Sequence, residues 1–141
     1  MIDTIYFEGP TCCGKSTMMN EFNKITNYQY TCIDRGHLSG VVEATLRSRD
    51  NLDFRQQGLD AELLNERSLI VLCGYWNYDE NRKRWMTRGD TIVTDVKDLR
   101  KEYDTWKRVI DEQGLSGHKY VKRVSHAANL VGVIESMNRT R

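Results

Sequence analysis

The sequence predicts a small three-layer α/β domain with a mostly parallel central sheet. Short apolar runs with the length of buried strands alternate with longer segments whose apolar residues recur at helical spacing. A glycine-rich stretch, GPTCCGKST, joins the first run to the first helical segment. Strands that alternate with helices pair in parallel, and the ligands of such sheets gather at the carboxyl ends of the strands.

Each element of the first half has its own signal. Ile2–Phe7 (IDTIYF) is apolar enough for a buried strand and stops just before a glycine. Lys15–Ile25 (KSTMMNEFNKI) places its methionines, phenylalanine and isoleucine along one stripe, which is typical of a helix packed on a sheet. Tyr28–Ile33 (YQYTCI) predicts a second strand, and two helices follow at Val41–Arg47 and Gln56–Asn65, joined by the polar loop SRDNLD.

The second half repeats the alternation. Ser68–Cys73 (SLIVLC) is the clearest strand, because five apolar residues follow the serine. After a basic segment, Asp95–Glu112 has the periodicity of a long amphipathic helix. Lys119–Val124 and Ala127–Met137 predict the last strand and the closing helix. We expect residues 1–141 to form one domain, since a chain of this length supports a single core.

The composition excludes several classes of protein. With 21 Lys and Arg against 20 Asp and Glu, the net charge of +1 creates no overall field that attracts nucleic acid or an anionic membrane. No apolar run is long enough to cross a membrane, and the N-terminus lacks the features of a signal peptide. The four cysteines have no paired C-x-x-C spacing, which indicates a reducing compartment, so the expected location is the cytoplasm.

The glycine-rich stretch matches the phosphate-binding P-loop pattern G-x4-G-K-S, with a strand before it and a helix after it. Its glycines allow backbone N–H groups to surround phosphate oxygens, and the helix start adds positive potential. Lys15 can span the β- and γ-phosphates, and the hydroxyl of Ser16 can join a magnesium shell. We therefore expect a nucleoside triphosphate to be bound by Gly9, Pro10, Thr11, Cys12, Cys13, Gly14, Lys15, Ser16 and Thr17.

The double cysteine of the loop changes little of this chemistry. Cys12 and Cys13 occupy variable positions of the pattern, where only the backbone needs to contact phosphate. Tolerated small side chains are the simpler interpretation, and redox control of the loop is the alternative.

A P-loop alone does not separate kinases from GTPases or motor ATPases. A GTPase would also carry the guanine-reading pattern N-K-x-D, which Asn23-Lys24-Ile25-Thr26 does not match, and a suitable D-x-x-G is absent. Motor ATPases usually need a much longer chain. The rest of the sequence therefore has to decide the class.

Asp34 and Arg35 follow the second predicted strand, so they should emerge at the same sheet edge as the P-loop. A carboxylate there can accept the proton of an attacking group or hold magnesium waters, and the guanidinium can clamp a phosphate through two hydrogen bonds. The alternative is a turn aspartate beside a surface arginine.

A second cluster of cations lies in RKRWMTRGD, within a segment at about 79–94. Arg84 and Arg88 are four residues apart, so on a helix they share a face. Mobile arginines that close over a moving phosphoryl group stabilise its negative charge. We expect this segment to be a lid, with a solvated basic helix face as the alternative.

These motifs resemble the thymidylate kinase and deoxynucleoside kinase group of P-loop kinases through most of the chain. FEGPTCCGKST is similar to that family's first strand and P-loop, and Asp34, Arg35 and Ser39 to its Asp-Arg-x3-Ser signature. Arg84, Arg88 and Gly89 are similar to the R-x-x-x-R-G of its lid. The resemblance implies ATP and Mg²⁺ as co-substrate and cofactor, with Asp34 as base or magnesium-shell carboxylate and the arginines on the phosphates.

The chain also departs from that family. Asp34 follows Lys15 more closely than usual, so the region that shapes the acceptor site is shortened. Thr11 stands where thymidylate kinases carry a carboxylate for the acceptor sugar. On the acceptor side, Arg47 and Arg49 are candidates for contact with the acceptor phosphate.

The sequence thus predicts an ATP-dependent kinase for a nucleotide, most simply a (deoxy)nucleoside monophosphate such as dTMP. The catalytic candidates are Lys15, Asp34, Arg35, Arg84 and Arg88, and Ser16 and Asp34 are the metal candidates. The chain also resembles phage-type polynucleotide 5′-kinases, in which Asp34 would be the base towards a nucleic-acid end. A nucleotide-binding module without catalysis is a third interpretation. Related kinases often form homodimers through helices such as Val41–Arg47 and Gln56–Asn65.

Overall fold

The computed structural model describes residues 1–88 and 96–140. Within these residues one four-stranded sheet has the order β2-β1-β3-β4, and every pairing is parallel. The strands are β1 (Thr4–Glu8), β2 (Thr31–Asp34), β3 (Ser68–Cys73) and β4 (Val121–Val124). Their parallel pairing confirms the predicted α/β class and places all four carboxyl ends at one edge.

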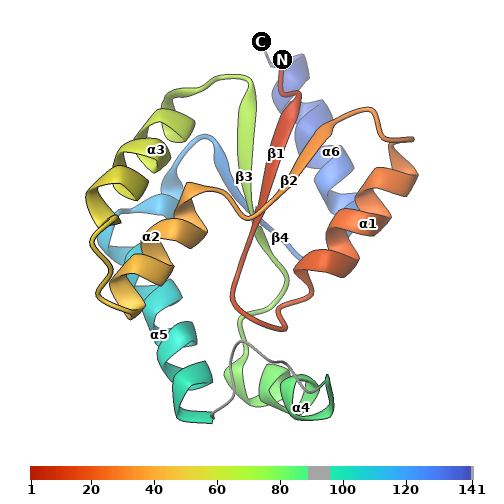
Figure 1. Cartoon of the computed structure of the whole chain (residues 1–141). Helices are drawn as coiled ribbons and strands as arrows, with labels where there is room; N and C mark the ends of the chain where they lie inside the picture. The colour runs from red at the N-terminus through yellow and green to blue at the C-terminus, as the bar shows by residue number, and fades with distance from the viewer. Residues whose placement is uncertain (89–95, 141) are drawn as a thin grey trace.

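Helices cover both faces of this sheet (Figure 1). α1 and α6 lie on one face and α2, α3 and α5 on the other, which completes the three layers, whereas α4 lies beyond the carboxyl edge of the sheet. The helices are α1 (Lys15–Ile25), α2 (His37–Leu46), α3 (Leu52–Leu64), α4 (Tyr78–Arg88), α5 (Val96–Glu112) and α6 (Ala127–Arg139), with a short 3₁₀ helix, η1, at Leu115–Gly117.

The predicted bounds are reproduced at both ends for α1 and β3, and the other elements differ by a few residues. β2 begins at Thr31 and not at Tyr28, because Asn27 and Tyr28 have positive φ angles of 53° and 57° and form a turn. β1 and β4 each begin two residues later than predicted, and α6 runs two residues further. The predicted start of α5, Asp95, lies outside the described residues.

α2 begins at His37, four residues before its predicted start, and α3 also begins four residues early. α2 begins early because its start is hydrogen-bonded to side chains from other elements. The carboxylate of Glu8 accepts a hydrogen bond from the backbone N–H of Gly36 at 3.1 Å, and the carboxylate of Glu62 accepts one from the N–H of His37 at 3.1 Å. These side chains from β1 and α3 satisfy N–H groups that a helix start leaves without partners.

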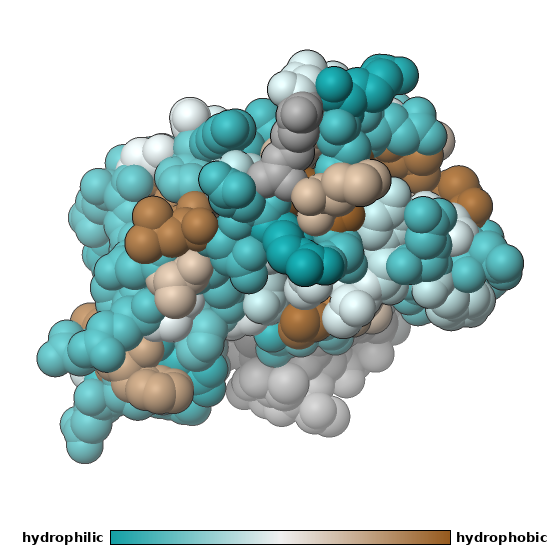
Figure 2. Space-filling view, turned by 90° about the horizontal axis from the view of Figure 1, so that it is seen from above, coloured by the Kyte–Doolittle hydropathy of each residue, from teal (hydrophilic) through white to brown (hydrophobic). Residues whose placement is uncertain are grey.

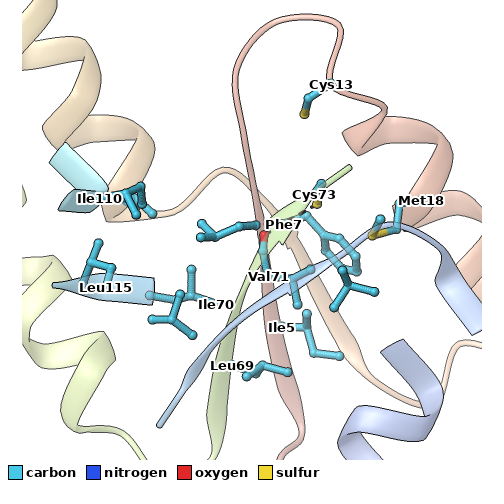
Figure 3. Packing of buried hydrophobic residues seen from close by; sticks show 14 of the residues in the cluster. Ile5, Phe7, Cys13, Met18, Leu69, Ile70, Val71, Cys73, Ile110 and Leu115 are labelled. Carbon is cyan, nitrogen blue, oxygen red and sulfur yellow. Dashed lines mark hydrogen bonds between the residues drawn. The ribbon is translucent and has the colours of Figure 1, made fainter. Parts of the chain in front are cut away.

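The core lies where the central strands meet the helices on both faces (Figure 3). Every residue of β3 is buried, as expected for a central parallel strand covered on both sides. Ile5 and Phe7 of β1 join it, with Met18 of α1 on one face and Ile110 of α5 on the other. A rigid core directly behind the carboxyl edge holds the loops of that edge in place.

The surface at the end that carries the chain termini is mostly hydrophilic, with separate hydrophobic patches (Figure 2). α3 exposes three large apolar side chains, those of Leu52, Phe54 and Leu64. Self-association through α2 and α3 stays a prediction. None of the described helices combines the length and the apolar character that a membrane span requires.

Candidate functional site

The P-loop, residues 9–17, connects β1 to α1 at the carboxyl edge of the sheet. Gly14 precedes the helix with a φ of 95°, a left-handed conformation that favours glycine, and the helix starts at Lys15. The loop lines a cavity of about 90 Å³ together with one residue from another element, Arg35. The loop residues on this cavity are Pro10, Thr11, Cys12, Cys13, Gly14, Lys15, Ser16 and Thr17. Gly9 precedes them and lines the neighbouring cavity.

Both P-loop cysteines are buried free thiols. Burial raises the pKa of the Cys13 thiol to about 11, so it carries no thiolate at neutral pH. Because the thiolate is the reactive form, this argues against redox control of the loop through Cys13. Both cysteines are small buried side chains that line the P-loop cavity.

The second predicted site segment lies beside the P-loop strand. Phe7 of β1 is opposite Asp34 of β2, and the backbone N–H of Arg35 donates to the carbonyl oxygen of Phe7 at 3.1 Å. This register confirms that Asp34 and Arg35 emerge at the same edge as the P-loop. The ammonium group of Lys15, which is buried, pairs with the half-exposed carboxylate of Asp34. Lysine has three donors, so this pair leaves Lys15 able to donate to a phosphate as well.

Arg35 directly follows β2, an outer strand of the sheet, and lies beside the P-loop. Its φ of 68° is left-handed, a conformation that costs a non-glycine residue about 1–2 kcal/mol. Its side chain lines the P-loop cavity, a second cavity of about 370 Å³ beside α2 and α5, and a third of about 430 Å³ between α2 and α3. A single residue, Arg35, therefore borders all three spaces.

The 370 Å³ cavity, called here the acceptor cavity, combines opposite charges with an apolar wall. Arg35 and Arg55 contribute positive charge, and Glu43 and Glu102 contribute negative charge. The remaining lining residues are Gly9, Gly36, Ser39, Gly40, Val42 and Trp106. A ligand with an anionic end, hydroxyl groups and a flat apolar surface would match these walls.

Arg55 was not predicted from the sequence as a site residue. It reaches the acceptor cavity because Gly40 has no side chain: a Cβ at Gly40 would lie 2.4 Å from Cδ of Arg55. The predicted candidates Arg47 and Arg49 pair at the surface with Glu43, with 3.5 Å between the Arg49 and Glu43 atoms. Arg55 thus lines this cavity, whereas a role of Arg47 and Arg49 in contacting the acceptor phosphate stays a prediction.

Glu102 of α5 is a second residue that sequence reasoning missed. Its carboxylate accepts hydrogen bonds from the backbone N–H of Thr11 at 2.7 Å and from the Thr11 hydroxyl at 2.9 Å. The neighbouring Tyr103 hydroxyl donates to the carbonyl oxygen of Thr11. Burial raises the pKa of Glu102, while the hydrogen bonds from Thr11 and the charge of Arg35 oppose that rise. α5 thus holds the P-loop at Thr11 and places a carboxyl group at the site.

Glu8, at the end of β1, supports the site from beneath. Its carboxylate is fully buried and accepts hydrogen bonds from the N–H of Gly36, the N–H of Ser39 at 3.2 Å and the Ser39 hydroxyl. Burial raises the pKa of Glu8 to about 7. Ser39 of the Asp-Arg-x3-Ser segment therefore serves, in this structure, to fix the start of α2 just after Arg35.

The predicted lid begins with α4, which lies at the same end of the molecule as the P-loop (Figure 1). Asn81 anchors α4, because its buried side chain donates to the carbonyl oxygen of Tyr75 at 2.8 Å. Arg84 is exposed on the helix. Arg88 is the last residue of α4, but its side chain and residues 89–94 lie outside the described part of the chain, so their role stays a prediction.

The residues present fit a magnesium ion held mainly by phosphate. Within the described residues, no group of three or more His, Cys, Asp or Glu side chains is arranged to hold a metal. Mg²⁺ characteristically binds through one or two protein oxygens, water and substrate phosphates. The exposed Ser16 and half-exposed Asp34 are the oxygen donors at the P-loop that could complete such a shell.

Comparisons with known proteins support the fold. No protein-family model matches the sequence, and a search of curated proteins finds no match. Among solved structures, the chain is similar to the YorR protein of Bacillus subtilis, which was crystallised in complex with phosphorylated GDP. The two share 18% sequence identity and a TM-score of 0.63 over 96% of this chain and 98% of that chain. The likeness shows that the two chains share the same three-layer fold.

Proposed function

We propose that the protein is an ATP-dependent nucleotide kinase that transfers the γ-phosphoryl group of ATP to a (deoxy)nucleoside monophosphate such as dTMP. The position of Arg35, which borders both the P-loop cavity and the acceptor cavity, is the observation that carries this proposal. A donor triphosphate in one cavity and an acceptor phosphate in the other would meet at its guanidinium.

In this proposal the donor is held by the P-loop. The Lys15 ammonium and those backbone N–H groups of the loop that are not already bonded to Glu102 or to Pro10 contact the β- and γ-phosphates. Ser16 and Asp34 would hold Mg²⁺, which when bound would neutralise charge on those phosphates. The bond between the γ-phosphorus and its bridging oxygen breaks, a bond to an acceptor oxygen forms, and the products are ADP and a nucleoside diphosphate.

Arg35 and Asp34 serve the transfer from the acceptor side of the edge. Arg35 can bind an oxygen of each phosphate, which fixes the attacking and transferred groups relative to each other. Asp34 is close enough to Lys15 to pair with it, so its carboxylate lies beside the donor phosphates and can receive a proton there. Arg84 and Arg88 of the lid segment would add positive charge as the group moves.

A kinase for a small nucleotide is favoured over one for a polynucleotide end. The acceptor cavity is bounded by side chains of α2, α3 and α5, and Glu43 and Glu102 line it, which disfavours the approach of a polyanionic strand. We also propose a cytoplasmic location, since all four cysteines are free thiols.

The test is transfer of label from ATP to a panel of acceptors. We would supply nucleosides, the deoxynucleoside and ribonucleoside monophosphates, and oligonucleotides with a 5′-hydroxyl, and repeat the assay with labelled GTP. Label should appear on a monophosphate, and Lys15→Ala should slow its appearance by about 100- to 1000-fold. Label on the oligonucleotide alone would favour the polynucleotide kinase, and binding of ATP without any transfer would favour the non-catalytic module.

A further inference from the structure

Thr11, in the P-loop, is held by α5 through every polar group that it has. Its backbone N–H and its hydroxyl donate to the carboxylate of Glu102, and its carbonyl oxygen accepts from the hydroxyl of Tyr103. Thr11 also lines the P-loop cavity. The shape of this side of the cavity therefore depends on where α5 holds Thr11.

Tyr103 makes a second set of contacts, with the predicted lid helix α4. Its hydroxyl accepts a hydrogen bond from the side chain of Asn81, and its ring packs edge-on against the ring of Tyr78, with the centroids 5.9 Å apart and the planes at 75°. Tyr103 is only 1% exposed, and burial raises its pKa, so the hydroxyl keeps its proton at neutral pH. This one hydroxyl group thus donates to the P-loop and accepts from α4.

The amide of Asn81 is well placed for its bond to Tyr103. The side chain of Asn81 is only 2% exposed, and one of its N–H groups donates to the carbonyl oxygen of Tyr75 at 2.8 Å, in the connection between β3 and α4. A primary amide has two N–H donors, so the second can serve Tyr103. A buried amide needs both partners, because an unpaired buried polar group destabilises the fold.

α4 depends on α5 for its position. It lies beyond the carboxyl edge of the sheet, outside the three layers, and packs against α5 (Figure 1). The guanidinium of Arg100 on α5 lies over the ring of Tyr78, 4.9 Å from its centroid. Tyr78 and Asn81 belong to the first turn of α4, and Arg84 is exposed on the same helix. A change in the position of Tyr103 would therefore be passed to the helix that carries Arg84.

We propose that Tyr103 is a positioning residue that couples the P-loop to α4, so that phosphates bound at the loop order the helix that carries Arg84. The path consists of two hydrogen bonds at one hydroxyl, from Tyr103 to Thr11 and from Asn81 to Tyr103. The inference rests on the proposed function for the role of α4 as a lid. Coupling between two sites is reciprocal and commonly changes an equilibrium about 5- to 150-fold. α4 should therefore open less often when the P-loop is occupied.

The experiment measures amide hydrogen exchange in α4, which requires neither an acceptor nor catalysis. Exchange of residues 78–88 is followed by mass spectrometry in the full-length protein, with and without saturating ATP and Mg²⁺. In the wild type, ATP should slow exchange in α4 at least about fivefold, because an ordered helix opens less often. ATP that binds but leaves exchange in α4 unchanged would overturn the proposal.

Two variants test the two ends of the path. Tyr103→Phe removes the hydroxyl and keeps the ring against Tyr78, and ATP should then slow exchange in α4 by no more than about twofold. Asn81→Ala removes the α4 end of the path and should give the same result. The matched control is Tyr28→Phe, because Tyr28 is 69% exposed, and it should behave as the wild type does. Thermal denaturation of each variant establishes that it is folded.

A direct contact between bound phosphates and Arg84 would also slow exchange in α4, without any path through Tyr103. Arg84→Ala removes that contact and leaves the hydrogen bonds of Tyr103 intact. In this variant ATP should still slow exchange at least about fivefold. If Arg84→Ala loses the effect of ATP and Tyr103→Phe keeps it, the proposal is wrong.

The outcomes separate this inference from the proposed function. If ATP orders α4 through Tyr103 but no acceptor receives a phosphoryl group, the coupling stands and the kinase proposal fails. If transfer occurs but ATP slows exchange in α4 equally in the wild type and in Tyr103→Phe, the kinase proposal stands and the coupling is wrong.

Discussion

Replacing Glu8 by glutamine should remove a large part of the pH dependence of stability. Burial raises the pKa of Glu8 from 4.5 to about 7 in the folded protein. The folded state therefore holds this proton more tightly than the unfolded state. The protonated Glu8 carboxyl contributes fully to the unfolding free energy below the pKa that it has in the unfolded state. This contribution is lost as the pH rises through the pKa that it has in the folded state. The shift corresponds to about 3 kcal/mol of unfolding free energy, of which roughly 2.5 kcal/mol falls between pH 5 and pH 8.

The assay is urea denaturation, followed by tryptophan fluorescence, at several pH values between 5 and 8. Glutamine stays neutral throughout, and its amide oxygen can still accept from the N–H groups of Gly36 and Ser39. Between pH 5 and pH 8 the unfolding free energy of the Glu8→Gln variant should therefore fall by about 2.5 kcal/mol less than that of the wild type. Glu21→Gln, at an exposed position of α1, should follow the wild type. Parallel profiles for Glu8→Gln and the wild type would refute the buried, proton-binding role of Glu8.

Four further substitutions test the fold and the lid. Gly74→Ala forces a φ of +70° on alanine and places a Cβ 2.0 Å from the carbonyl oxygen of Cys13, so calorimetry should find nucleotide binding lost. Gly132→Ala has open space around its Cβ, so urea denaturation should find the unfolding free energy raised by about 0.5–1 kcal/mol. Leu59→Ala, at a fully buried site of α3, should lower the unfolding free energy by about 2–5 kcal/mol. Arg84→Ala should lower kcat in steady-state assays and leave ATP affinity nearly unchanged, and a loss of ATP affinity alone would contradict its role in the lid.

Sequence patterns correctly predicted the bounds of those elements that depend only on residues close in the sequence. α1 and β3 have the predicted bounds because an apolar stripe and a fully apolar run define them. The early start of α2 could not be predicted, since the side chains that accept its first N–H groups, Glu8 and Glu62, come from distant parts of the chain. Helix starts fixed by tertiary hydrogen bonds leave no signal in a single sequence.

The residues of the site also fall into those that the local sequence predicts and those that it does not. Asp34 and Arg35 could be placed at the P-loop edge, because parallel strands bring their carboxyl ends together and the residues follow a strand directly. Arg55 lies in the first turn of α3 and Glu102 in the middle of α5, and they reach the site only through the glycine gap at Gly40 and the hydrogen bonds to Thr11. Only the packing of the helices brings these two residues to the site, and no sequence motif indicates that they belong to it.

The most direct test of the account is the affinity of a two-headed analogue in which an oligophosphate chain joins adenosine to thymidine. Calorimetry would compare it with ADP on the wild type and on Arg35→Ala. If Arg35 joins a donor cavity to an acceptor cavity, the analogue should bind the wild type at least about 100-fold more tightly than ADP does, and Arg35→Ala should remove most of that gain. An analogue that binds the wild type no more tightly than ADP would contradict the convergence of donor and acceptor at this edge.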